Sequence, residues 1–205
     1  MAVKKKKAAR AQTKTTPKAK TRTKPKATAA AKRAPKAMSQ EEMMAQWKAA
    51  MTPSAGHALL MPMVGTWRAT TSFTMAPGAP PQVSQGTSVN RLVLGGRFLE
   101  QAYKGTAMNM PFEGIGFTGY DNVQKRYVGT WMDTMGTGMM TSIGVGRPTD
   151  ERMDFVCEAI EPSGRKKIFD AIIRVHGHAR HSYEMLTKGP NGKNYRVMMI
   201  EYERA

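Results

Sequence analysis

Two acidic side chains are the first candidates for chemistry. Asp133 follows Trp131 at a spacing of two residues, and Glu113 lies in the strand-like run just before. If these carboxylates converged and burial raised the pKa of one of them, the pair could act as general acid and base. Alternate positions on the solvent side of a sheet are also often acidic, so a role without catalysis is favoured for Asp133 and Glu113.

Three histidines near the C-terminus are the candidates for a metal site. His176 and His178 are separated by one residue, and His181 follows. Two imidazoles at this spacing on a strand share a face, which suits a metal ion. However, Gly177 lies between them at a predicted turn, and no cysteine or carboxylate is close in sequence. A solvent-exposed hairpin tip is therefore favoured over a metal site.

The sulfur-containing residues have simpler interpretations. Met108 and Met110 could in principle bind Cu(I), but most of the 18 methionines are expected to fill irregular apolar space. Cys157 is the only cysteine, so it cannot form an intramolecular disulfide. Its apolar neighbours predict a buried thiol, and a single free cysteine is typical of a reducing compartment.

A predicted hairpin from Met110 to Asp133 must position the central candidates. Alternate residues from Phe112 to Tyr120 share one face, and a second alternating run follows the turn at Asp121 and Asn122. Alternating glycines in a strand allow sharp bending or close approach of a bulky group. Side chains from both faces of this hairpin are candidates for a ligand-binding wall: Phe112, Tyr120, Trp131 and Met132.

About ten strand-like runs follow one another between Gly65 and Glu203, separated by turn residues. No stretch among them has helical periodicity long enough to cross over a parallel sheet. The sequence therefore predicts an all-β fold, an antiparallel up-and-down barrel, with a short N-terminal helix. A barrel of this size has room for an interior cavity.

Several motifs occur in a specific order and resemble one family. The segments 60–67, 94–98, 111–121 and 127–133 are similar to the bacterial family called domain of unknown function 1579. The resemblance covers about residues 39–204 and implies a lipocalin-like, or calycin-type, barrel without a settled activity. Gly65 and Trp67 also resemble the first-strand signature of lipocalins, which implies that Arg204 closes the barrel over Trp67.

Three functions are considered for such a barrel. The leading hypothesis is non-catalytic binding of a small apolar molecule, without a cofactor. The alternatives are an enzyme that uses Asp133 or Glu113, and a haem protein of the nitrobindin type that uses one histidine. No haem-specific pattern accompanies the histidines.

The first 37 residues form a separate basic tail. They carry 14 of the 32 Lys and Arg residues and no Asp or Glu, whereas the rest of the chain has 18 basic and 15 acidic residues. The composition predicts a disordered segment that binds DNA or RNA through phosphates, with a merely solubilising extension as the alternative. The cationic residues are Lys4, Lys5, Lys6, Lys7, Arg10, Lys14, Lys18, Lys20, Arg22, Lys24, Lys26, Lys32, Arg33 and Lys36.

A capping box begins the segment after the tail. Ser39 is followed three residues later by Glu42, and the apolar residues Met43, Met44, Trp47 and Met51 then fall on one helical face. We expect this helix to cover one end of the barrel, with a partner-binding face as the alternative. The predicted division is a tail over 1–38, a helix and linker over 39–56, and a barrel over 57–205.

The sequence also indicates where the chain works. It contains no apolar h-region of a secretory signal and no apolar run long enough to cross a bilayer, which predicts a cytoplasmic protein without a membrane span. Nucleoid association would follow if the tail binds DNA. Pairing of two barrels through a sheet edge or an apolar patch would give a homodimer.

Overall fold

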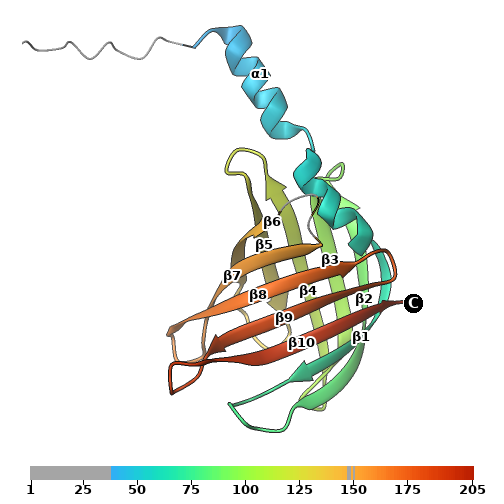
Figure 1. The fold of residues 1–205 in the computed structure, drawn as a ribbon, viewed down its shortest axis with the longest axis vertical. Coiled ribbons are helices and arrows are strands. Elements are labelled where there is room, and N and C mark those ends of the chain that lie inside the picture. Colours follow the sequence, from blue (N-terminus) through green and yellow to red (C-terminus); the bar gives the residue numbers. More distant parts are fainter. Residues whose placement is uncertain (1–37, 147–148, 150) are drawn as a thin grey trace, which may run out of the picture. The chain divides into compact units, whose positions relative to one another are not determined.

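Ten antiparallel strands close into one barrel in this computed structural model, which describes residues 38–146, 149 and 151–205 (Figure 1). Each strand pairs with its neighbours in chain order, and β1 also pairs with β10, so the predicted up-and-down barrel is confirmed. The strands are β1 Gly65–Phe73, β2 Gln82–Val93, β3 Phe98–Ala107, β4 Met110–Asp121, β5 Arg126–Asp133, β6 Met140–Gly146, β7 Arg152–Ile160, β8 Lys166–His176, β9 Arg180–Lys188 and β10 Asn194–Arg204.

Two helical segments precede the barrel. The α-helix α1 spans Gln40–Met51, and the 3₁₀ helix η1 spans Ala55–Met63. The predicted capping box begins α1: the Glu42 backbone N–H donates to Ser39 Oγ over 3.1 Å, and the Ser39 N–H donates to Glu42 Oε2 over 2.7 Å. Thr52 follows the last residue of α1, and Pro53 comes directly after it.

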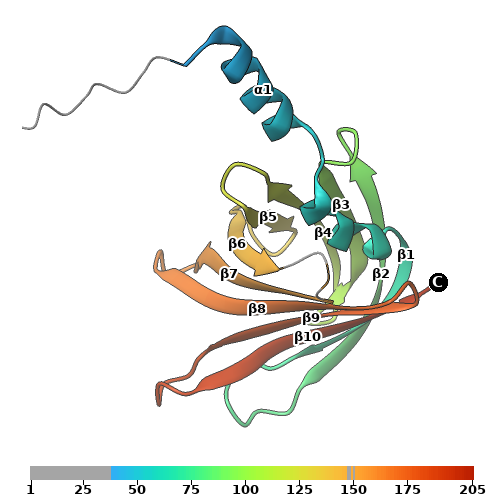
Figure 2. The same cartoon turned by 45° about the horizontal axis from the view of Figure 1, so that its top comes forward.

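The helix η1, and not α1, closes one end of the barrel. Leu59, Leu60 and Met63 of η1 are buried in the larger hydrophobic core, whereas α1 has no buried residue. The expectation that α1 covers the barrel was therefore wrong. The Tyr127 hydroxyl of β5 also donates to the carbonyl of Gly56, near the start of η1, over 2.6 Å. Figure 2 shows η1 at the same end as the C-terminus.

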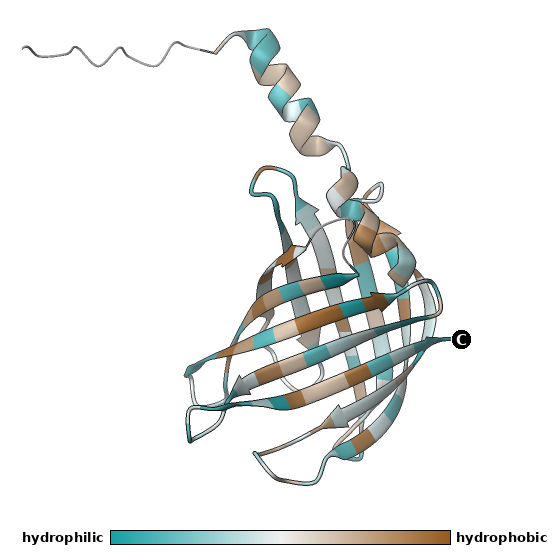
Figure 3. Cartoon of the chain, in the orientation of Figure 1, coloured by the Kyte–Doolittle hydropathy of each residue, from teal (hydrophilic) through white to brown (hydrophobic). Residues whose placement is uncertain are grey.

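The strand register decides which side chains point inward. Trp67 of β1 is the register partner of Ser88 in β2 and of Arg204 in β10. Because side chains alternate between the two faces of a strand, this register fixes which residues of all ten strands point inward. Hydropathy alternates along the ribbons accordingly, with polar and apolar residues interleaved on most strands (Figure 3).

The connection between β2 and β3 consists of four residues, Leu94, Gly95, Gly96 and Arg97. Leu94, Gly95 and Gly96 all have positive φ, at 51°, 66° and 83°. The Gly96 N–H donates to the carbonyl of Val93 over 3.1 Å, and the Arg97 guanidinium donates to the carbonyl of Leu94.

Candidate functional site

The barrel interior divides into two parts. Near η1 the larger core cluster includes Leu60, Tyr127 and Met153, all fully buried. A smaller cluster extends from Trp67, whose Nε1–H donates to the carbonyl of Met63 in η1 over 2.9 Å, to Tyr103 and Tyr202. Three half-buried side chains pack against this cluster, namely Phe112, Trp131 and Ile200. We call the part of the interior around Tyr103, Phe112 and Trp131 the far half.

A cation–π contact between Arg204 of β10 and Trp67 of β1 links the last strand to the first. The Arg204 guanidinium carbon lies 4.3 Å from the centre of the Trp67 ring. The same guanidinium donates to the carbonyls of His178, Val64 and Pro62 over 2.6, 3.2 and 3.3 Å. Gly65, at φ 137°, leaves room for Arg204, because a Cβ there would collide with the guanidinium. These contacts join η1, β1 and the β8–β9 turn at one end of the barrel.

His181 is buried beside the contact between Arg204 and Trp67. Its ring stacks on Tyr202 at 4.2 Å and meets the edge of Trp67 at 4.4 Å. Burial lowers the pKa of His181 to about 3, and the charges of Arg204 and His176 act in the same direction. His181 is therefore neutral at neutral pH, and its Nδ1 has no hydrogen-bond partner among the described residues.

Trp131 lies against the wall of the far half rather than across it. Its indole ring covers two glycines of β4: a Cβ on Gly114 would lie 2.8 Å from Cη2, and a Cβ on Gly116 would lie 2.7 Å from Cε3. The indole Nε1–H donates to Asp133 Oδ2 over 2.8 Å, which fixes the ring in this position. The alternating glycines of β4 thus accommodate a bulky aromatic side chain.

Tyr103 is positioned in the same way on the neighbouring strands. Its ring and hydroxyl occupy the space that Cβ atoms on Gly86 and Gly105 would need. Phe112 meets this ring edge-on, with 5.7 Å between the ring centres. Thr71 Oγ1 lies 3.4 Å from the Tyr103 hydroxyl. The far half therefore presents aromatic faces together with hydroxyl groups.

A line of hydrogen bonds runs across the interior between the two clusters. The Gln101 amide donates to Ser88 Oγ and to the Tyr202 hydroxyl, each over 3.1 Å. Ser88 Oγ donates in turn to Asn90 Oδ1 over 2.8 Å, and Asn90 Nδ2 donates to the carbonyl of Met63 over 3.0 Å. Burial raises the pKa of Tyr202, so its hydroxyl stays protonated.

Cys157 and Tyr183 form a second polar pair on inward-facing positions of β7 and β9. Burial raises the pKa of the Cys157 thiol to about 11, although its hydrogen bond with Tyr183 acts in the opposite direction. Burial also raises the pKa of Tyr183. The thiol is free and buried, and it remains protonated at neutral pH. Cys157 is therefore a poor nucleophile in the folded protein.

The two candidate carboxylates do not converge. Gly114 pairs with Asp133, so Asp133 faces inward, while Glu113 faces outward and forms an exposed ion pair with Lys104 over 3.1 Å. The proposed acid–base pair of Asp133 and Glu113 is thus not assembled. Asp133 already accepts the Trp131 Nε1–H and, through Oδ1, the Met135 N–H over 2.9 Å.

The wall candidates separate by face. Phe112 and Trp131 line the far half, and Tyr120 faces inward near η1, where its ring packs on Tyr127 at 5.0 Å. Met132 pairs with Ile115 on the outer face, so it does not line the interior. Sequence reasoning missed Tyr103, Gln101 and Tyr202, because nothing in their spacing distinguishes an inward polar residue from an outward one.

The candidate metal and haem ligands are dispersed. His176 and His178 are exposed, and His181 is enclosed between Trp67 and Tyr202. The Nδ1 of the fourth histidine, His57, accepts the Ser54 N–H over 3.0 Å. The Nδ1 of His181 is buried and has no hydrogen-bond partner among the described residues, and its ring faces are covered by Trp67 and Tyr202. Within 38–146, 149 and 151–205, no group of three His, Cys, Asp or Glu side chains could hold a metal ion.

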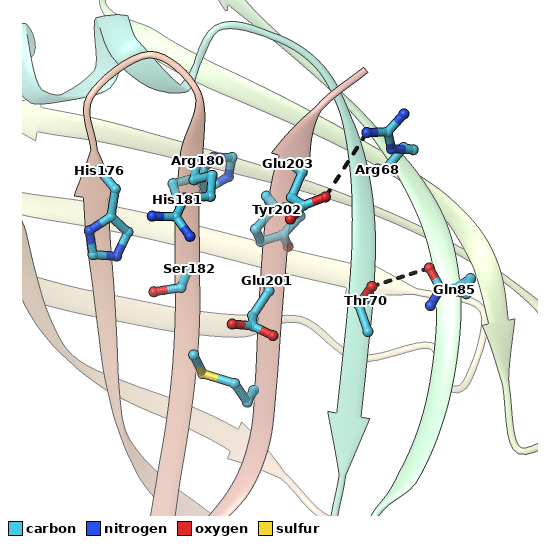
Figure 4. A pocket seen from close by; sticks show the side chains of 11 residues that line it. Arg68, Thr70, Gln85, His176, Arg180, His181, Ser182, Glu201, Tyr202 and Glu203 are labelled. Atoms are coloured by element: carbon cyan, nitrogen blue, oxygen red, sulfur yellow. Dashed lines mark hydrogen bonds and ion pairs between the residues drawn. The ribbon is translucent and has the colours of Figure 1, made fainter.

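A hollow of about 420 Å³ lies on the outer surface of the barrel (Figure 4). Outward-facing polar side chains of β1, β2, β8, β9 and β10 line it, including Arg68, Arg180, Glu201 and Glu203. Arg68 and Glu203 approach to 4.0 Å and are both largely exposed. Such solvated ion pairs contribute little to stability. The inward-facing His181 and Tyr202 also line the hollow, whereas Trp131 and Phe112 do not.

The predicted tail, with its 14 cationic residues, lies outside the described residues. Among the helices of the part that the structure describes, none is long and apolar enough to span a membrane.

Comparisons with known proteins place the fold and the family. A search of curated proteins found no match. The solved structure of Rv2717c from M. tuberculosis is similar at a TM-score of 0.57 and 16% identity, over 75% of this chain and 98% of that one. The S-type phycobiliprotein lyase CPES from Guillardia theta matches at a TM-score of 0.49 and 12% identity, over 77% of this chain and 96% of that one. A family model matches residues 52–204, and the chain therefore belongs to the family described as protein of unknown function (DUF1579).

Proposed function

We propose that the barrel binds a small, mainly apolar molecule in the far half of its interior. The observation that carries this proposal is the position of the aromatic rings. Trp131 and Tyr103 lie along the wall, in space that glycines leave free, while Trp131 and Phe112 remain half-buried. Rings that served only to fill the interior would be fully buried, as Trp67 and Tyr127 are.

The polar groups of the far half suit one end of such a ligand. The hydroxyls of Thr71 and Tyr103 lie beside the aromatic faces. Ligand sites are typically apolar surfaces with a few placed polar groups that fix orientation. We therefore expect a ligand with an apolar body and one hydrogen-bonding group.

The positions of Asp133 and Glu113 favour binding over catalysis. The two oxygens of Asp133 each accept one hydrogen bond, from Trp131 and from Met135, and Glu113 lies on the opposite face of the sheet. A pair of carboxylates that acts as acid and base must reach the same substrate, which Asp133 and Glu113 do not. The nucleic-acid role of the tail stays a prediction, as do the boundaries of the tail and the linker.

The test is a fluorescence titration with N-phenyl-1-naphthylamine, an apolar dye that brightens in apolar surroundings. Trp131→Ala should weaken binding by about tenfold, because a large aromatic contact is lost. Met132→Ala is the matched control, since it removes an adjacent side chain from the outer face. Equal affinities of the two variants, or no binding by the unmodified protein, would refute the proposal.

A further inference from the structure

The helix α1 exposes an apolar face that the rest of the described chain leaves uncovered. Met44, Trp47 and Met51 retain 61%, 59% and 53% of their accessible surface, and α1 has no buried residue. Exposed apolar patches of this kind mark interaction sites. We propose that the exposed apolar face of α1 attaches the protein peripherally to an anionic lipid membrane.

The exposed side chains form one stripe along the helix. Met43, Trp47 and Met51 follow one another at intervals of four residues, and Met44 lies beside them. The opposite side of α1 carries Glu42 and small alanines. A helix with an apolar stripe and a Trp can lie in the plane of a lipid interface, with the stripe facing the acyl chains.

The attachment of α1 to the barrel leaves this stripe free. Asn122, in the β4–β5 turn, donates its side-chain amide to the carbonyls of Ala49, Ala50 and Thr52 over 3.1, 3.3 and 2.7 Å. These bonds use only backbone acceptors at the C-terminal end of α1. The helix is thus held by its last turn, and it extends beyond η1 (Figure 1).

Charge identifies the surface that the stripe meets. Residues 1–37 carry 14 Lys and Arg and no acidic residue, and they end three residues before α1. Within α1 itself Glu41 and Glu42 outnumber Lys48, so the attraction to an anionic surface comes from the preceding segment. Stable peripheral attachment usually requires two signals, and an apolar insertion next to a polybasic segment supplies both.

Nucleic acid would satisfy only one of these features. Phosphates attract the basic segment, but a duplex offers no apolar surface on which three methionines and a Trp would be buried. Both features also lie before residue 52, where the family match begins. A lipid surface accounts for the helix and the basic segment together.

The experiment uses the full-length chain and sedimentation with two kinds of vesicle. One kind contains phosphatidylglycerol and phosphatidylcholine in equal parts, and the other contains phosphatidylcholine alone. The variant Met44→Gln, Trp47→Gln, Met51→Gln removes the stripe, and Ala45→Gln changes the opposite side as its control. Because these residues are not buried, all variants should keep the melting temperature of the unmodified protein.

We expect the unmodified protein to bind the anionic vesicles and the triple variant to bind them about tenfold or more weakly. The affinity of Ala45→Gln should equal that of the unmodified protein. Trp47 emission should shift to shorter wavelength on these vesicles, and the shift should disappear in Trp47→Phe. Equal binding by the triple variant, or no binding to anionic vesicles by a protein that still binds duplex DNA, would overturn the proposal.

Discussion

Gly114→Ala tests the position of Trp131, on which the binding wall depends. A Cβ at Gly114 would lie 2.8 Å from Cη2 and 3.0 Å from Cε2 of the indole, with Cζ2 nearer still. Real Cβ atoms do not approach so closely, so the ring must leave the wall. It would then lose its hydrogen bond to the Asp133 carboxylate, which is worth about 1.5–3 kcal/mol.

The expected cost follows from three contributions. Overpacking adds about 1–3 kcal/mol, whereas replacement of glycine stabilises the folded state by about 0.4–1 kcal/mol through the unfolded chain. We therefore expect the free energy of unfolding of Gly114→Ala to fall by about 1.5–5.5 kcal/mol, measured by urea denaturation. Gly138→Ala is the control, because no heavy atom lies within 4 Å of its Cβ position. If both variants unfold within about 0.5 kcal/mol of each other, the ring does not lie on Gly114.

Three further predictions concern Arg204, Cys157 and His181. Arg204→Met should lower the free energy of unfolding by about 1–3 kcal/mol, because contacts with Trp67 and three carbonyls are lost; an unchanged urea midpoint would contradict this. With a pKa of about 11 instead of 9.0, Cys157 should react with iodoacetamide at pH 8 about 100-fold more slowly than in urea, and equal rates would disprove its burial. The pKa of His181 is lowered from 6.5 to about 3, so its neutral form should stabilise the fold fully above pH 6.5, and this contribution should be lost as pH falls toward 3. His181→Phe should flatten the plot of unfolding free energy against pH over this range. An unaltered plot would exclude His181 as the source of this pH dependence.

Sequence patterns predicted the barrel well where one face of a strand is clearly apolar or glycine-rich. The β4–β5 hairpin, predicted from Met110 to Asp133, has these bounds in the structure, since turn residues separate its two strands. The beginning of β2 gave no such signal. Its inward residues there include Ser84, Ser88 and Asn90, so polar side chains occupy the face that pattern reasoning expects to be apolar.

The candidate site was harder to predict, because alternation identifies two faces without saying which one is inward. Trp131 and Met132 were equally good wall candidates until the barrel closure placed them on opposite sides. Asp133 and Glu113 were separated for the same reason. The apolar stripe of α1 was identified correctly, but a stripe does not specify what covers it. The helix that closes the end of the barrel is η1, whose nine residues are too few to show helical periodicity.

Native mass spectrometry of the full-length chain from its own cells tests the central claim most directly. We predict one additional mass for a small apolar molecule on each barrel, which excess N-phenyl-1-naphthylamine displaces. The measured chain mass without any addition, both as isolated and after incubation with the dye, would contradict a ligand site in the barrel interior.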